Sequence, residues 1–200
     1  MIRRQFASTS LLAALIALGA TGFSSAALAH VGDHASGLAG GLAHPFSGLD
    51  HVLAMVAVGL WASQLERPAN WILPLTFPVV MAFGAFLGAS GLMLPYAEPA
   101  IAASVLVFGA VIALALKPSL TVSAVLIALF ALFHGYSHGV EAPAQGSVLA
   151  YDAGFIVATL ALHAIGFAIG AAANHAPVRY VARTAGAAIA AIGVVLLAAV

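Results

Sequence analysis

The chain has 200 residues, of which 64% are hydrophobic and only 6% are charged, with Lys+Arg 6 against Asp+Glu 6. A soluble domain carries about 25% charged residues, so this composition excludes a soluble globular protein and indicates an integral membrane protein. Six scattered cations cannot form the basic patch of a nucleic-acid-binding protein, and the lack of cysteine excludes disulfide scaffolds and thiolate metal sites.

The first 29 residues are typical of a secretory signal peptide. Arg3 and Arg4 form a positive start, and Leu11–Ala20 is an apolar core of about ten residues, too short for a bilayer that takes about 20. Residues 27–29 (Ala-Leu-Ala) offer the small-x-small pattern that signal peptidase cuts. Cleavage there would leave residues 30–200 as a single transmembrane domain that begins in the periplasm.

Six apolar segments beyond the signal peptide predict an all-α polytopic bundle of six transmembrane helices. Each segment is long enough to cross a bilayer, and the short connections between them contain Pro, Gly or charge. The alternation of a membrane barrel is absent. The predicted spans are Pro45–Gln64, Trp71–Leu94, Pro99–Leu116, Leu120–Gly139, Val148–Ala173 and Tyr180–Val200.

The distribution of charge predicts the orientation of these spans. If residue 30 is periplasmic, then Arg67, Lys117, Arg179 and Arg183 all fall at cytoplasmic ends, as the positive-inside rule requires. Most carboxylates fall on the other side. We therefore expect a multi-pass protein of the bacterial inner membrane, with the mature N-terminus and the C-terminus in the periplasm.

Three polar side chains at the start of the first span favour a metal site. His44 and His51 are seven residues apart, so on one continuous helix they share a face about 10 Å apart along the axis. Asp50 adjoins His51 and could bind a metal directly or hold an imidazole in one tautomer. A proton relay through Asp50 and His51 is the alternative.

The end of the fourth span carries the most specific pattern. His134 and His138 are four residues apart, and Glu141 follows three residues later, so all three line one stripe of a helix. This is the spacing at which a helix presents two imidazoles and a carboxylate to one cation. An ionisable group in hydrocarbon costs about 2.5 to 3.5 kcal/mol on insertion scales, so its presence indicates function.

Three further candidates are Asp152 and His163 on the fifth span and His30 at the mature N-terminus. Asp152 and His163 are eleven residues apart, which returns to within about 20° of the same helix face. His163 also fits a hydrogen bond between helices. His30 could chelate through its amine and imidazole. The small residues of Gly84–Gly88 and Gly166–Gly170 predict close helix packing.

The segment His44–Trp61 (HPFSGLDHVLAMVAVGLW) is similar to the signature of the HupE/UreJ family. The resemblance continues through Phe133–Gly139 with Glu141, and through Ala161–Gly166, and it covers essentially the whole chain. These proteins are hydrogenase- and urease-associated membrane proteins regarded as nickel, sometimes cobalt, permeases. The resemblance therefore implies metal uptake. Ser137 and Val140 depart from the family's usual pattern, at positions other than those of the expected ligands.

These observations predict a non-enzymatic secondary transporter that takes Ni²⁺ or Co²⁺ across the membrane, with no catalytic residues. Imidazoles and carboxylates suit several late transition metals, so Zn²⁺ remains a candidate occupant. No phosphate-binding loop is present, so ATP is not the local energy source. The expected partners are the metal ion and the lipid bilayer, and homo-oligomerisation stays open. The alternatives are an intramembrane zinc-dependent hydrolase acting on lipid and a haem protein with His axial ligands.

Overall fold

The computed structural model describes residues 37–142, 146–173 and 179–200. The chain divides into two units, Met1–Ala35 and Ser36–Val200, and all of the described residues belong to the second. The predicted signal peptide and His30 lie outside the described residues. Their roles stay predictions.

Every element of secondary structure in the described ranges is a helix, which confirms the all-α class. Backbone N–H and C=O groups in an apolar chain must pair within the chain, and helices achieve this locally. The fifth predicted span has the bounds that the sequence predicts. The elements are α2 (Gly37–Ala43), the 3-10 turn η2 (His44–Phe46), α3 (Leu49–Ala62), α4 (Ala69–Ala89), α5 (Ala97–Ala113), α6 (Leu120–Val140), α7 (Val148–Ala173) and α8 (Arg179–Ala198).

The first predicted span is broken, which corrects the expectation of one continuous helix over Pro45–Gln64. Residues Gly37–Phe46 and Leu49–Ala62 meet at 84°. The break comes at Gly48, whose extended backbone (φ −115°, ψ 124°) precedes the first turn of α3. His44 therefore sits on η2 and His51 on α3, not two turns apart on one helix face.

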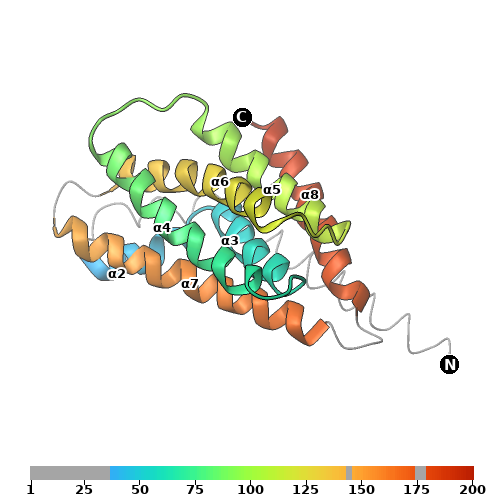
Figure 1. The fold of residues 1–200 in the computed structure, drawn as a ribbon. Coiled ribbons are helices and arrows are strands. Elements are labelled where there is room, and N and C mark those ends of the chain that lie inside the picture. Colours follow the sequence, from blue (N-terminus) through green and yellow to red (C-terminus); the bar gives the residue numbers. More distant parts are fainter. Residues whose placement is uncertain (1–36, 143–145, 174–178) are drawn as a thin grey trace. The chain divides into compact units, whose positions relative to one another are not determined.

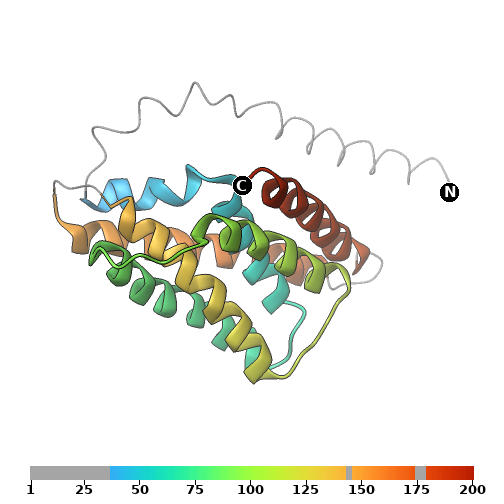
Figure 2. The ribbon, with the colours of Figure 1, turned by 90° about the horizontal axis from the view of Figure 1, so that it is seen from above.

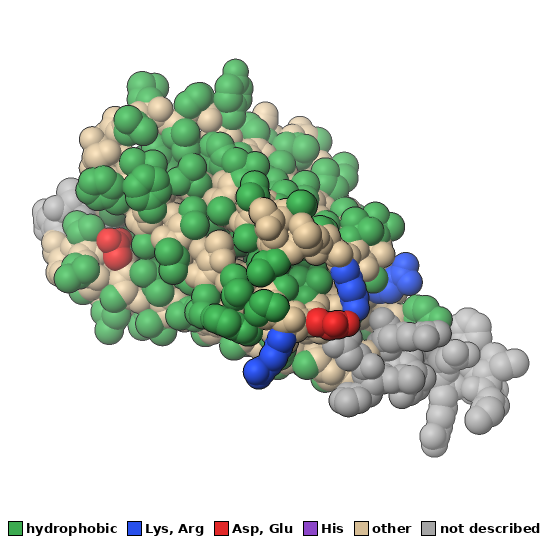
Figure 3. Space-filling view, in the orientation of Figure 1, with side chains coloured by type: hydrophobic (Ala, Val, Ile, Leu, Met, Phe, Trp, Pro, Cys, Tyr) green, Lys and Arg blue, Asp and Glu red, His purple; other side chains and the backbone are tan. Residues whose placement is uncertain are grey.

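Four of the described helices, α4, α6, α7 and α8, are long and apolar enough to cross a membrane. The bent pair of α2–η2 and α3 makes a fifth candidate if it counts as one span, and α5 is a shorter apolar helix of 17 residues. Apolar side chains cover most of the face shown in Figure 3. The protein is therefore a multi-pass membrane protein, whereas the number of six spans stays a prediction.

Helix α3 lies at the centre of the bundle. It packs against α7 on one side and α5 on the other, and most of its second half is buried, including Trp61 (Figures 1 and 2). Around it α4 pairs with α6, α5 with α8, and α2 with α7. This central helix carries His51 into the interior.

Glycines bring α4 and α6 close together, as the Gly84–Gly88 spacing predicts. A Cβ on Gly84 or Gly88 would overlap the α6 backbone at Leu132 and Tyr136. From the other side, a Cβ on Gly135 would overlap the carbonyl oxygen of Met81. Since no side chain fits at these glycine positions, the α4 and α6 backbones are in contact there, and this contact fixes the positions of the α6 histidines relative to α4.

Charge separates along the bundle. Hydrogen bonds from Trp61 Nε1 to Leu116 O (3.2 Å) and from Arg183 Nε to Ala113 O (2.8 Å) join the end of α3 to the end of α5 and the start of α8. Arg67, Lys117 and Arg183 belong to this basic end, and Lys and Arg side chains gather at one end in Figure 3. Helix α3 begins at the opposite end, where Glu98 and Glu141 line one pocket.

Candidate metal-binding site

Four histidines from three elements come together at the start of α3. His134 and His138 are fully buried on one face of α6. The ring of His51 lies 4.9 Å from each of them, and the ring of His44 lies 4.7 Å from His138, measured between centroids. We call His44, His51, His134 and His138 the histidine cluster. Residues that the sequence placed on separate spans therefore meet at one point.

An open pocket with a volume of about 200 Å³ leads to the cluster. Three carboxylates line this outer pocket: the predicted site residues Asp50 and Glu141, and also Glu98 at the start of α5, which the sequence analysis did not select. The usable signal was that Glu98 shares a predicted side of the membrane with Glu141. The lining residues are His44, Ser47, Gly48, Asp50, His51, Glu98, Ser137 and Glu141.

Asp50 fixes the tautomer of His51. Its Oδ1 accepts a hydrogen bond from the His51 backbone N–H (2.7 Å) and lies 2.8 Å from His51 Nδ1. An ionised carboxylate only accepts, so Nδ1 carries the proton and Nε2 keeps its lone pair. Of the two roles predicted for Asp50, the geometry therefore favours the support of an imidazole ligand.

Glu141 lies at the opening of the outer pocket. Its Oε2 lies 3.2 Å from His44 Nε2, and its Oε1 accepts a hydrogen bond from Ser137 Oγ (3.0 Å). The hydrogen bond from His44 lowers the pKa of Glu141 below its ordinary value, and Ser137 acts in the same direction while burial opposes them. A negative charge therefore persists where a cation would arrive.

His134 also presents a free lone pair. Ser104 Oγ donates to the carbonyl oxygen of Ile101 (2.6 Å), so it must accept from His134 Nε2, which lies 2.9 Å away. The other nitrogen, Nδ1, then carries the lone pair and has no hydrogen-bond partner among the described residues. Both ring nitrogens of His138 and Nε2 of His51 are likewise buried without a partner there. Each unpaired buried group costs about 1–3 kcal/mol, and a bound cation would remove that cost.

The cluster is not in coordination geometry. Within the described ranges, no group of three or more His, Cys, Asp or Glu side chains is arranged to hold a metal ion. The rings meet edge to face, at 62° to 85°, whereas coordination needs nitrogens directed at one point about 2.0–2.1 Å away. Ring rotation would have to precede binding.

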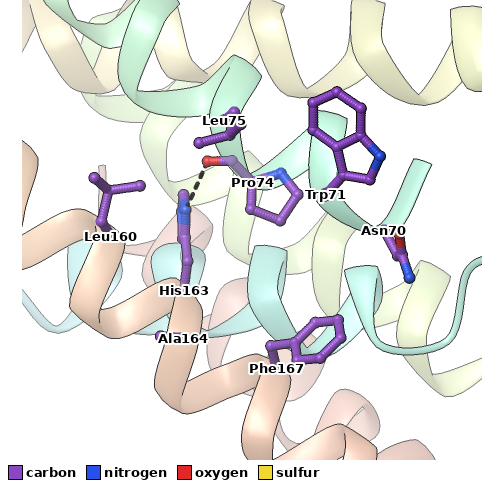
Figure 4. Close-up of a pocket in the computed structure, with 8 residues that line it drawn as sticks. All are labelled: Asn70, Trp71, Pro74, Leu75, Leu160, His163, Ala164 and Phe167. Carbon is purple, nitrogen blue, oxygen red and sulfur yellow. Dashed lines mark hydrogen bonds between the residues drawn. The ribbon is translucent and has the colours of Figure 1, made fainter. Parts of the chain in front are cut away.

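His163 lies apart from the cluster. Phe77 separates it from His134, with ring centroids 5.5 Å from His134 and 5.3 Å from His163. His163 Nδ1 donates to the carbonyl oxygen of Pro74 (3.0 Å; Figure 4). That oxygen lacks its usual helical donor because residue 78 is proline, which has no N–H. The hydrogen bond between helices, one of the two roles predicted for His163, is present.

His163 also lines a second pocket with a volume of about 410 Å³, the inner pocket. Most of its lining is apolar (Figure 4). Asp152 is half-buried and is not among the residues that line either pocket. The residues of the inner pocket are Asn70, Trp71, Pro74, Leu75, Leu160, His163, Ala164 and Phe167.

Comparison with known proteins agrees with the resemblance in the sequence. The family model described as HupE / UreJ protein matches residues 16–196. Protein HupE of Rhizobium leguminosarum bv. viciae is 47% identical over 180 residues, which are 90% of this chain and 94% of that protein. No solved structure gives a significant match. The chain belongs to the HupE/UreJ family.

Proposed function

We propose that the protein takes up a divalent transition-metal ion, nickel or cobalt, across the bacterial inner membrane to supply the maturation of hydrogenase or urease. The observation that carries this proposal is the convergence of four histidines from three elements, several with buried nitrogens that have no partner among the described residues. Packing alone gives no reason to bury these nitrogens together. Membership in the HupE/UreJ family supports the same conclusion.

The proposed path begins at the outer pocket. Carboxylates of Asp50, Glu98 and Glu141 attract the hydrated cation, and imidazoles of the cluster then replace its water molecules. Imidazole suits Ni²⁺, Co²⁺ and Zn²⁺ alike, whereas Mg²⁺ and Ca²⁺ prefer oxygen ligands. The free Nε2 of His51 and Nδ1 of His134 are the first candidate ligands, because their tautomers are already set by Asp50 and Ser104.

The proposed topology places the outer pocket toward the periplasm and the basic end in the cytoplasm. Six spans, cleavage after residue 29 and periplasmic termini complete it. The membrane potential then suffices as a driving force, since moving a dication across 100 mV is worth about 4.6 kcal/mol, twice the value for one charge. Transport needs no nucleotide under these conditions.

A transporter fits the outer pocket better than a lipid hydrolase does. The pocket is lined by histidine, carboxylate, serine and glycine residues, which suit a hydrated ion. A lipid substrate would need an apolar cleft beside the metal ligands. The hydrolase is therefore not the favoured function.

Uptake of ⁶³Ni²⁺ and ⁵⁷Co²⁺ by cells that express the full chain tests the proposal. His51→Ala and His138→Ala are each expected to reduce uptake by more than about 100-fold, since removing a ligand costs more than the 10- to 100-fold lost with a supporting group. Glu66→Gln, at the basic end, is the control and should behave as wild type. Variant levels in the membrane are compared by immunoblot. Undiminished uptake in both histidine variants would overturn the proposal.

A further inference from the structure

The inner pocket contains two polar atoms that no described residue satisfies. A carbonyl oxygen only accepts, so His163 Nδ1 carries the proton that it donates to Pro74, and His163 Nε2 carries a lone pair. This Nε2 is buried without a hydrogen-bond partner in the described ranges, and the same is true of Asn70 Oδ1. Both side chains belong to residues that line the inner pocket. The pocket therefore offers two free hydrogen-bond acceptors.

The two acceptors belong to points about one helix turn apart along α4. His163 is bonded to Pro74, and Pro74 follows Asn70 by four residues on that helix. One turn of an α-helix rises about 5.4 Å. A ligand that satisfies both acceptors must therefore carry two donors at separate places.

The rest of the inner pocket is apolar and partly aromatic. Trp71 of α4 and Phe167 of α7 line it together with His163, as Figure 4 shows. Its volume of about 410 Å³ falls in the range of about 300–1,000 Å³ that is usual for small-molecule sites. Trp71 and Leu75 are exposed, so the pocket opens on the side of the bundle that faces lipid. A ligand would enter from the bilayer and would itself be largely apolar.

The common contents of a membrane do not satisfy these acceptors. A buried water molecule needs two to four polar partners, and this lining is mostly apolar. The ester groups and acyl chains of a phospholipid carry no hydrogen-bond donor, and a long-chain alcohol carries one. A hydroquinone carries two hydroxyl donors on opposite sides of one flat ring, and its apolar tail is soluble in the bilayer.

We propose that the inner pocket binds the hydroquinone head of a membrane quinol. One hydroxyl donates to His163 Nε2 and the other donates to Asn70 Oδ1. Trp71 and Phe167 supply aromatic surface for the ring, since aromatic rings pair favourably in offset or edge-to-face arrangements. The tail leaves past the exposed Leu75 into the bilayer.

Calorimetric titration of the purified full chain in detergent, under anaerobic conditions, tests the site. The probe is decylubiquinol, and two matched ligands lack its donors: the oxidised decylubiquinone and the dimethyl ether of the quinol. A hydrogen bond is worth about 0.5–1.5 kcal/mol, which corresponds to about 2- to 13-fold in affinity. The two ligands without donors should therefore bind about 10- to 100-fold more weakly than the quinol.

Two variants remove one acceptor each. In His163→Asn the amide nitrogen takes about the place of Nδ1 and can still donate to Pro74, whereas no atom replaces Nε2. Asn70→Leu removes the other acceptor at nearly the same size and leaves the Pro74 hydrogen bond untouched. Each variant should bind decylubiquinol about 3- to 10-fold more weakly. Phe86→Leu, at an exposed residue of α4 that does not line the inner pocket, is the control and should match the wild type.

Three results would overturn this site. They are the lack of any quinol binding by the wild type, equal affinity for the quinol and its dimethyl ether, and unchanged quinol affinity in both variants. A phospholipid that stays bound in native mass spectrometry and that the quinol does not displace would also overturn it. No metal ion enters the experiment, so its result is independent of the proposed function.

Discussion

The two pockets of this bundle differ in almost every property that matters to a cation. The outer pocket has a volume of about 200 Å³ and is lined by three carboxylates and two histidines. The inner pocket is about 410 Å³ and mostly apolar, with His163 and Asn70 as its polar side chains. Nδ1 of His163 donates a hydrogen bond to the α4 backbone at the carbonyl oxygen of Pro74.

Under the proposed function, this difference between the two pockets gives ion movement through the bundle a direction. A hydrated dication gains charge-assisted contacts at the outer pocket, while the inner pocket offers it little beyond space. Under the proposed function, a site that binds the ion at one end and a weaker site beyond it would permit net movement under a membrane potential. The outer pocket should therefore control metal affinity, and the inner pocket should influence the stability of the bundle.

Among the changes that test this difference between the two pockets, Asp50→Asn should have the largest effect. The amide of asparagine can donate as well as accept, so it no longer fixes the His51 tautomer in which Nε2 has the lone pair. Metal affinity should fall by about 10- to 100-fold, the range seen when a supporting group is lost. Titration of the purified protein with Ni²⁺ measures this. An unchanged affinity would show that the Asp50–His51 contact does not prepare a ligand.

Acidification should have the next largest effect. An imidazole binds metal only in its neutral form, so protons compete with the metal ion and uptake should fall when the pH is lowered from 7.5 to 5.5. Because the pKa of Glu141 is lowered by His44, this carboxylate stays ionised over the same range. Equal ⁶³Ni²⁺ uptake at both pH values would contradict imidazole ligation.

His163→Ala should have the smallest effect on binding. Since Phe77 separates it from the cluster, the affinity for Ni²⁺ at the outer pocket should stay within about twofold, as for independent sites. Loss of the hydrogen bond to Pro74 should instead lower the free energy of unfolding by about 0.6–1.7 kcal/mol. Thermal unfolding in detergent checks this, and Phe167→Leu at the same pocket is the control for lost packing. A large loss of affinity would place His163 in the metal site.

Much of the fold follows from the sequence because the lengths of the apolar segments, and the Pro, Gly and charged residues between them, are local signals. The all-α class and the bounds of α7 are confirmed. The break at Gly48 was not predicted, because Pro45 suits the first turn of a helix and one extended glycine leaves little trace in an apolar run. Because of this break, His44 does not lie on the helix face that it was expected to share with His51.

The site could be predicted only where spacing within one element decides it. His134 and His138 share a face because they are four residues apart. By contrast, Glu98 reaches the outer pocket through the packing of α5 against α3, and spacing carries no information on that. His163 bonds the carbonyl oxygen of Pro74, which is free because Pro78 has no N–H. This pair is separated by 89 residues, so no local pattern reveals it.

That long-range hydrogen bond has a consequence for biogenesis. The ribosome completes α4 well before His163 is synthesised, so the carbonyl oxygen of Pro74 enters the bilayer without its final donor. Backbone groups in hydrocarbon are costly while unpaired. The packing of α7 against α4 therefore completes the hydrogen bonds of α4, even though α5 and α6 lie between the two helices along the chain.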